Sequence, residues 1–127
     1  MHVPSRLLIV EDDASVRRLV TAVVGMEFDE VVESADGLDG FGVAQAVQPD
    51  LVLLDLDLPG LDGLEVCRRL RGLAAFQNTP IVVLTAHVSE AYLRESAEAG
   101  ATDFLGKPFS PSQLRARLRT WLIRSQP

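Results

Sequence analysis

An unbroken apolar run, Leu51-Val52-Leu53-Leu54, ends in Asp55, and the turn-forming pair Pro59-Gly60 follows a few residues later. A run of this length is typical of a β-strand that is covered on both faces. A carboxylate placed where such a strand emerges into a turn is costly to bury unless something uses it. Asp55 is therefore the first residue for which the sequence indicates a chemical role.

Three other apolar runs also lead into polar residues, which are Glu11, Asp12 and Asp13 after residues 6–10, Thr85 after residues 81–84, and Lys107 after residues 102–105. The carboxyl ends of parallel strands share one edge of a sheet, and ligands bind along that edge. We therefore expect these acids, this hydroxyl and this ammonium to meet there.

Segments with helical spacing of apolar residues separate these runs. They cover residues 14–25, 37–47, 62–71, a stretch from Ser89 to Gly100, and a last stretch from Ser110-Pro111 onward. Asp13 and Asp62 are placed to cap two of them, and residues 73–80 are expected to form a loop. With a weaker strand at 29–34, the chain holds five β–α pairs. This alternation predicts an α/β fold with a five-stranded parallel sheet and helices on both faces.

The bulk composition indicates a single soluble domain. The chain has 127 residues, of which 47% are hydrophobic and 24% charged, so we expect one domain over residues 1–127 with a core of about 5–124. No run approaches the roughly 20 apolar residues of a membrane helix, and no export leader is seen. Cys67 is the only cysteine, so we expect no intrachain disulfide and interpret Cys67 as a small buried residue. These features favour the cytoplasm and no membrane association.

The net charge of −6 argues against direct nucleic-acid binding by this chain. Basic residues nevertheless crowd the last segment, as Arg115, Arg117, Arg119 and Arg124. We interpret them as a solvated helix face, with a docking surface as the alternative.

The acids and their neighbours are suited to phosphoryl chemistry at a metal. Carboxylates at positions 11, 12, 13 and 55 would repel one another unless a cation lies between them. Hard oxygen ligands at a hydrated site suit Mg²⁺, and an ionised aspartate is an established phosphoryl acceptor. The Lys107 ammonium and the Thr85 hydroxyl are suitable partners for phosphoryl oxygens.

Over nearly its whole length, the sequence resembles the receiver domain of bacterial two-component response regulators. The matching stretches are Leu8–Asp13 with Arg17, Leu53–Gly63, Pro80–Ala86, Ala99–Ala101 and Lys107–Phe109. The resemblance implies a flavodoxin-like (βα)5 fold with strand order 2-1-3-4-5. It also implies that the chain catalyses only its own phosphorylation and dephosphorylation and is not otherwise an enzyme.

The resemblance implies a role for each matching residue. Asp55 would be the phosphoacceptor. Asp12, Asp55 and the backbone carbonyl of Asp57 would bind Mg²⁺, or Mn²⁺ in its place, with Glu11 as the first member of the acidic pair. Asp13 would be a support or a helix cap.

The resemblance also implies which residues bind the phosphoryl group and which change conformation on phosphorylation. Lys107 would bind the phosphoryl group and precede a cis peptide to Pro108. Thr85 would be the switch hydroxyl and Phe104 the switch aromatic. Taken alone, Thr85 is an ordinary strand residue and Phe104 an ordinary core residue.

Some positions depart from the commonest family pattern. Phe104 replaces a tyrosine, so its ring cannot donate a hydrogen bond, and Gly106 is smaller than usual. Asp57 and His87 lie two residues after Asp55 and Thr85, at positions that flank the phosphoryl group in the family. We predict that these two residues tune the lifetime of the phosphoryl group.

The implied phosphodonor is a phosphohistidine on a sensor histidine kinase or a histidine phosphotransfer protein. Phosphorylation would alter the surface formed by the last two helices and the strand between them. A homodimer through that face is one expectation, although Arg115 and Arg117 match the charged dimer pattern only in part.

The main alternative is an enzyme. Residues 53–57 also resemble the nucleophile motif of haloacid-dehalogenase-type phosphatases, which would use Asp55 and Asp57. That family places its nucleophile near the chain start and its metal-binding acids later, whereas Glu11–Asp13 come first here. A flavin or nucleotide carrier lacks support because no glycine-rich loop follows the first strand. A pseudo-receiver used only for binding is disfavoured by the presence of Asp55 and Lys107.

Overall fold

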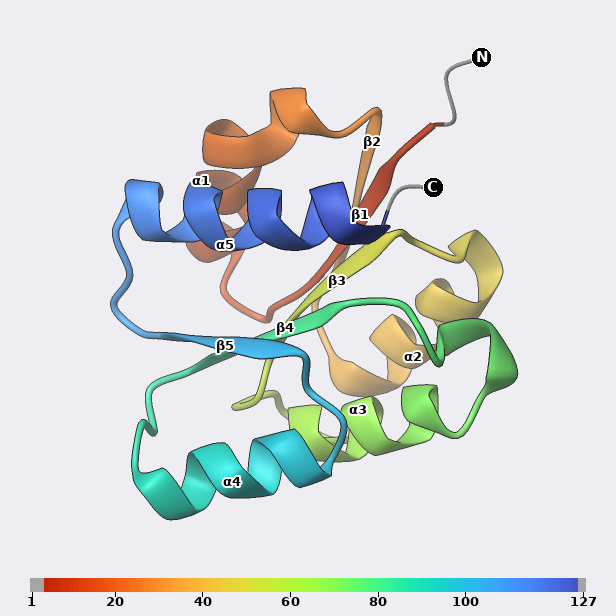
Figure 1. Cartoon of the computed structure of the whole chain (residues 1–127), viewed down its shortest axis with the longest axis vertical. Helices are drawn as coiled ribbons and strands as arrows, with labels where there is room; N and C mark the ends of the chain where they lie inside the picture. The colour runs from red at the N-terminus through yellow and green to blue at the C-terminus, as the bar shows by residue number, and fades with distance from the viewer. Residues whose placement is uncertain (1–3, 126–127) are drawn as a thin grey trace.

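The computed structural model describes residues 4–125 of the chain, with side chains described as far as residue 122. Within these residues, strands and helices alternate (Figure 1). The strands are β1 (Arg6–Val10), β2 (Glu30–Ser34), β3 (Leu51–Asp55), β4 (Ile81–Thr85) and β5 (Asp103–Gly106). The helices are α1 (Ala14–Val24), α2 (Gly37–Val47), α3 (Gly63–Arg71), α4 (Glu90–Glu98) and α5 (Pro111–Ser125), with short 3-10 turns η1 (Gly25–Glu27) and η2 (Ala74–Phe76).

The described strands form one parallel sheet in the order β2-β1-β3-β4-β5. This confirms the predicted α/β class and strand order. The central strands β3 and β4 are buried along their whole length, which explains their continuous apolar sequences. The strand expected at 29–34 is β2, an edge strand that is only partly buried.

Helices cover both faces of the sheet (Figure 1), with α1 and α5 on one side and α2, α3 and α4 on the other. Successive strand residues alternate between two hydrophobic clusters. Leu53 and Leu84 pack toward α1 and α5, whereas Leu54 and Val83 pack toward the opposite layer. This burial on both faces fixes the register of the strands, and the register determines which residues lie at the carboxyl-terminal edge of the sheet.

The predicted helix caps are present. Asp13 accepts a 2.8 Å hydrogen bond from the backbone of Ser15, and Asp62 accepts one of 2.9 Å from the backbone of Glu65. Residues 73–80, expected to be a loop, contain η2 and the buried ring of Phe76. One buried aromatic residue in a stretch this short gives no periodicity, so the sequence pattern did not indicate this turn.

Gly63 allows α3 to begin directly against the end of β3. A side chain at this position would collide with the carbonyl oxygen of Asp55 and the backbone of Leu56. The glycine therefore helps to fix the turn that carries Asp55.

The α5 arginines with described side chains form ion pairs within the chain. Arg115 and Arg119 lie 3.9 and 2.7 Å from Glu27, and Arg117 lies 2.6 Å from Asp103. Arg119 is exposed, as a solvated helix face predicts, whereas Arg115 and Arg117 are half-buried. The side chain of Arg124 lies outside the described residues. Cys67 is buried, as expected. In the part of the chain that the structure describes, no helix is long and apolar enough to cross a membrane.

Candidate functional site

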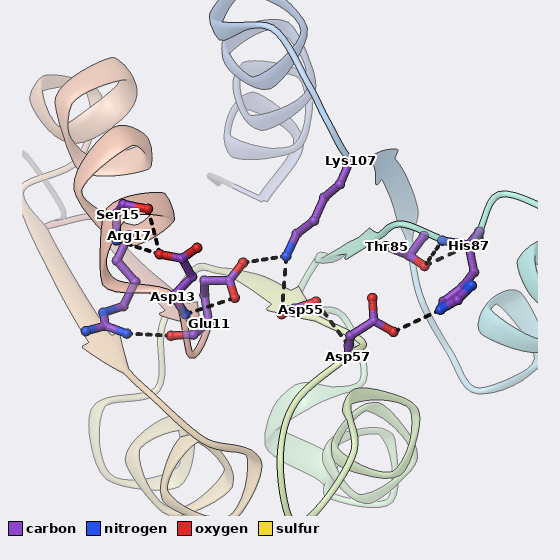
Figure 2. A network of polar contacts seen from close by, with 9 residues as sticks. All are labelled: Glu11, Asp13, Ser15, Arg17, Asp55, Asp57, Thr85, His87 and Lys107. Atoms are coloured by element: carbon purple, nitrogen blue, oxygen red, sulfur yellow. Dashed lines mark hydrogen bonds and ion pairs between the residues drawn. The ribbon is translucent and has the colours of Figure 1, made fainter.

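Polar side chains from the ends of four strands meet at one edge of the sheet (Figure 2). Glu11 follows β1, Asp55 and Thr85 end β3 and β4, and Lys107 follows β5. The pairing of Asp55 with Leu84, and of Thr85 with Gly106, places the last three next to one another. The convergence expected from the sequence is therefore present.

Asp55 lies almost fully buried, with 1% of its surface exposed. One carboxylate oxygen accepts a 3.0 Å hydrogen bond from the backbone of Asp57. The other lies 3.3 Å from the Lys107 ammonium. Each of its two carboxylate oxygens therefore faces a hydrogen-bond donor or a cation.

Glu11 is the second buried acid, and it is fully enclosed. Its carboxylate accepts a 2.7 Å hydrogen bond from Lys107 and a 3.3 Å bond from the backbone of Asp13. The pKa of Glu11 is raised from 4.5 to about 7, chiefly by burial and also by the neighbouring Asp55, while Lys107 opposes the shift. Two buried carboxylates thus share one ammonium.

Lys107 is the only lysine in the chain. Burial alone lowers its pKa, but the hydrogen bond to Glu11 and the charge of Asp55 outweigh that effect and raise it. The side chain therefore stays protonated. The peptide bond from Lys107 to Pro108 is cis, as expected.

Glu11, Asp12 and Asp55 each offer a carboxylate oxygen within 4.8 Å of the others. Asp12 is exposed, so a cation bound here would keep water on its open side. This donor set fits a hard, partly hydrated divalent cation such as Mg²⁺. Asp13 instead caps α1, and its two hydrogen bonds from Ser15 lower the pKa of its carboxyl.

Thr85 is fully buried, and its hydroxyl is bonded to the backbone of His87. It accepts a 2.9 Å hydrogen bond from the amide of His87 and donates one of 3.3 Å to the carbonyl. Thr85 lies on β4, next to the strand that carries Asp55, but its hydroxyl points to the backbone of His87.

Asp57 and His87 face each other across the mouth of the site (Figure 2), with Nε2 of His87 3.5 Å from an oxygen of Asp57. The ring of His87 also meets the ring of Tyr92 edge-on, at 5.4 Å between centroids. The sequence did not indicate a role for Tyr92 at the site, because nothing in the helical spacing of Tyr92 predicts a contact with the loop that precedes α4.

Phe104 is partly buried against the α2–α3–α4 cluster. The guanidinium of Arg117 lies 5.9 Å from its ring centroid and is held by Asp103. Trp121 donates a 2.9 Å hydrogen bond to the same carboxylate. The predicted switch aromatic is thus bordered by polar groups of α5.

The family model of the response regulator receiver domain matches residues 7–119. The DNA-binding response regulator MtrA from Mycobacterium tuberculosis is 42% identical over 120 residues, which cover 94% of this chain and 51% of that protein. The probable transcriptional regulator ycf27 from Cyanophora paradoxa is 40% identical over 121 residues, covering 95% of this chain and 49% of that protein. The chain therefore spans about half the length of these curated relatives.

Solved structures share the whole fold. A putative response regulator from Chloroflexus aurantiacus has a TM-score of 0.88 and 36% identity, covering 96% of this chain and 100% of that chain. The receiver domain of a sensor histidine kinase from Pseudomonas aeruginosa, with a magnesium ion coordinated in its active site cleft, has a TM-score of 0.83 and 29% identity, covering 94% and 98%. The Mn²⁺-bound form of response regulator Rcp1 has a TM-score of 0.82 and 29% identity, covering 94% and 95%.

Proposed function

Because this chain belongs to the response regulator receiver domain family of two-component systems, we propose that it is a signalling domain whose Asp55 accepts a phosphoryl group. One observation carries the proposal: a buried carboxylate at the end of β3 lies 3.3 Å from the only lysine, with two further acids close by. The donor is a phosphohistidine on a sensor histidine kinase or a histidine phosphotransfer protein.

The transfer is a displacement at phosphorus. A carboxylate oxygen of Asp55 forms a new P–O bond while the P–N bond to the donor histidine breaks, and the electron pair returns to the imidazole nitrogen. Negative charge on the phosphoryl oxygens then needs compensation. Lys107 supplies it, because its ammonium already lies between Glu11 and Asp55.

Glu11, Asp12, Asp55 and the backbone carbonyl of Asp57 would hold Mg²⁺, or Mn²⁺ in its place. When bound, the cation neutralises charge on the acids and on the phosphoryl oxygens. Support comes from the three clustered carboxylates and from the magnesium and manganese ions in the structures of two relatives. The chain catalyses its own phosphorylation and dephosphorylation and no other reaction.

Thr85 and Phe104 carry the change to the surface. The hydroxyl of Thr85 turns to the phosphoryl group, Phe104 moves into the space that it leaves, and the α4–β5–α5 face changes shape. That face is also the proposed homodimer contact.

Asp57 and His87 tune the lifetime of the phosphoryl group. Timing phosphate loss after substitution of each residue checks this, and unchanged half-lives would refute it.

An apolar groove beside the site provides a place for the phosphodonor to dock. It encloses about 440 Å³ and is lined by Val16, Leu19, Ala86, Lys107, Pro108 and Phe109. Because Lys107 belongs to both the groove and the site, a helix bound in the groove would bring its histidine close to Asp55. We propose that the partner presents such an apolar helix.

We propose that residues 1–127 act as one domain, with a core of about 5–124, in the cytoplasm. The relatives named DNA-binding are about twice as long as this chain. The net charge of −6 supports the absence of direct nucleic-acid binding by these residues.

The phosphatase alternative is not supported. The family match over residues 7–119 is to receiver domains, and the clustered acids Glu11 and Asp12 follow β1, ahead of Asp55 in the chain. Incubation with a generic phosphate ester separates the two functions. We expect negligible turnover of the ester, together with a stable label on Asp55 from a small acyl phosphate; rapid multiple turnover would contradict the receiver function.

A further inference from the structure

We infer that His87 is a positioning residue that ties the resting Thr85 hydroxyl to helix α4, so that its contacts with Asp57 and Tyr92 set how readily the hydroxyl turns to a phosphoryl group. Asp57, His87 and Tyr92 together are called the His87 clasp below. The inference rests on the proposed function, because it concerns the response of Thr85 to an occupied Asp55.

The backbone of His87 holds the Thr85 hydroxyl from two sides. Its amide donates to the hydroxyl at 2.9 Å, and its carbonyl accepts from the hydroxyl at 3.3 Å. The hydroxyl has a single proton, so donating it to a phosphoryl oxygen ends the bond to the His87 carbonyl. Rotation of the Thr85 hydroxyl therefore breaks a hydrogen bond to the backbone of His87.

The side chain of His87 is anchored on both sides. Asp57 approaches Nε2 at 3.5 Å (Figure 2), and the Tyr92 ring meets the imidazole edge-on at 5.4 Å and 62°. The contact with Asp57 joins two exposed groups, so it is weak by itself. Tyr92 packs against the hydrophobic cluster under α4, so it gives the imidazole a firm support.

The clasp joins the loop after β3, the loop after β4, and α4. Contacts that exist only in the resting state stabilise that state, so their removal shifts the equilibrium toward the state in which Thr85 meets the phosphoryl group. From the usual strength of an aromatic pair, loss of the Tyr92 contact should increase affinity for a phosphoryl mimic by about threefold to tenfold.

The test is a titration of the protein with beryllofluoride and Mg²⁺, which mimic a phosphoryl group on aspartate, followed by NMR. Tyr92→Leu and His87→Ala should bind beryllofluoride about threefold to tenfold more tightly than wild type. Tyr92→Phe keeps the ring and should bind as wild type does. Val88→Ala is the matched control, because Val88 is an exposed neighbour in the same loop.

A second measurement uses the metal-free protein. Tyr92→Leu should shift the ring resonances of His87 and its amide, whereas Tyr92→Phe should leave them close to wild type. Equal beryllofluoride affinity in wild type and Tyr92→Leu, or equal disturbance by Tyr92→Phe and Tyr92→Leu, overturns the clasp alone. A wild-type protein that binds no beryllofluoride at Asp55 overturns the proposed function itself.

Discussion

Lys107 donates a 2.7 Å hydrogen bond from its ammonium to Glu11, so the only lysine of the chain is tied to the acidic pair in the resting protein. Its distance to the other acid, Asp55, is longer, at 3.3 Å. A phosphoryl group on Asp55 would compete with Glu11 for the same ammonium. The strength of the Glu11–Lys107 contact therefore bears on both resting stability and phosphorylation.

The reactivity of the single amine side chain should report this contact. Glu11 and Asp55 raise the pKa of Lys107, which keeps the free amine scarce and slows its acylation. Glu11→Gln removes one of these charges, so the pKa should fall and an amine-selective reagent should modify Lys107 faster, as read by peptide mass spectrometry. Glu65→Gln is the control, because Glu65 pairs with Arg68 and Arg69 within α3. Equal rates in wild type and Glu11→Gln would contradict the predicted coupling.

Stabilisation by Mg²⁺ should depend on pH. The folded protein raises the pKa of Glu11 from 4.5 to about 7, so the metal-free folded state binds this proton more tightly than the unfolded chain does. The contribution of Glu11 to the free energy of unfolding therefore falls as pH rises from about 4.5 through about 7.

A cation needs the ionised carboxylate, so the increase in Tm on adding Mg²⁺ should be small well below pH 7 and grow above it. Differential scanning calorimetry across this range measures the increase, and Glu11→Gln should flatten its pH dependence. An increase in Tm that is the same on both sides of pH 7 would be inconsistent with a metal site at Glu11.

Leu19 should matter for protein donors and not for small ones. It is 40% exposed in the apolar groove beside Lys107. Leu19→Asp should slow transfer from a histidine-phosphorylated phosphotransfer protein by about tenfold or more, because an apolar contact is replaced by a charge. Labelling by a small acyl phosphate should be unchanged.

The matched control for Leu19 is Leu38→Asp, since Leu38 is 67% exposed on α2, on the other side of the sheet. If Leu19→Asp and Leu38→Asp slow phosphoryl transfer from the protein donor to the same extent, the groove is not the docking site.

Two glycine substitutions should have opposite effects on stability. Gly63→Ala places a methyl group against the carbonyl oxygen of Asp55 and should lower the free energy of unfolding by about 1–3 kcal/mol. Gly42 lies inside α2 with open space around it, so Gly42→Ala should raise that free energy by about 0.5–1 kcal/mol. Urea denaturation measures both; a Gly63→Ala protein as stable as wild type would show that the turn after Asp55 adapts freely.

Much of this architecture follows from local sequence patterns. The apolar runs that became β3 and β4, and the caps Asp13 and Asp62, depend on neighbours in the chain, so the sequence alone indicated them. The meeting of Asp55 with Lys107 followed from their places at the ends of parallel strands. The strand order came from the family resemblance.

Other contacts depend on side-chain directions and loop paths that no periodicity encodes. The engagement of Thr85 by the backbone of His87 is one, and the approach of His87 to both Asp57 and Tyr92 is another. Arg117 reads as a surface charge in the sequence, yet it pairs with Asp103 and borders Phe104. The contacts of His87 with Asp57 and Tyr92, and of Arg117 with Asp103, join residues on different segments of the fold, so they exist only once these segments have packed together.

Intact-mass spectrometry after incubation with a small acyl phosphate and Mg²⁺ tests the central claim most directly. Wild type should gain one phosphoryl group, and Asp55→Asn should gain none. Asp50→Asn should be labelled as wild type is, because Asp50 directly precedes β3, at the end of the strand remote from Asp55, and its carboxylate accepts a hydrogen bond from the backbone of Arg6. A label of wild-type extent on Asp55→Asn, or no label on wild type, would contradict Asp55 as the phosphoacceptor.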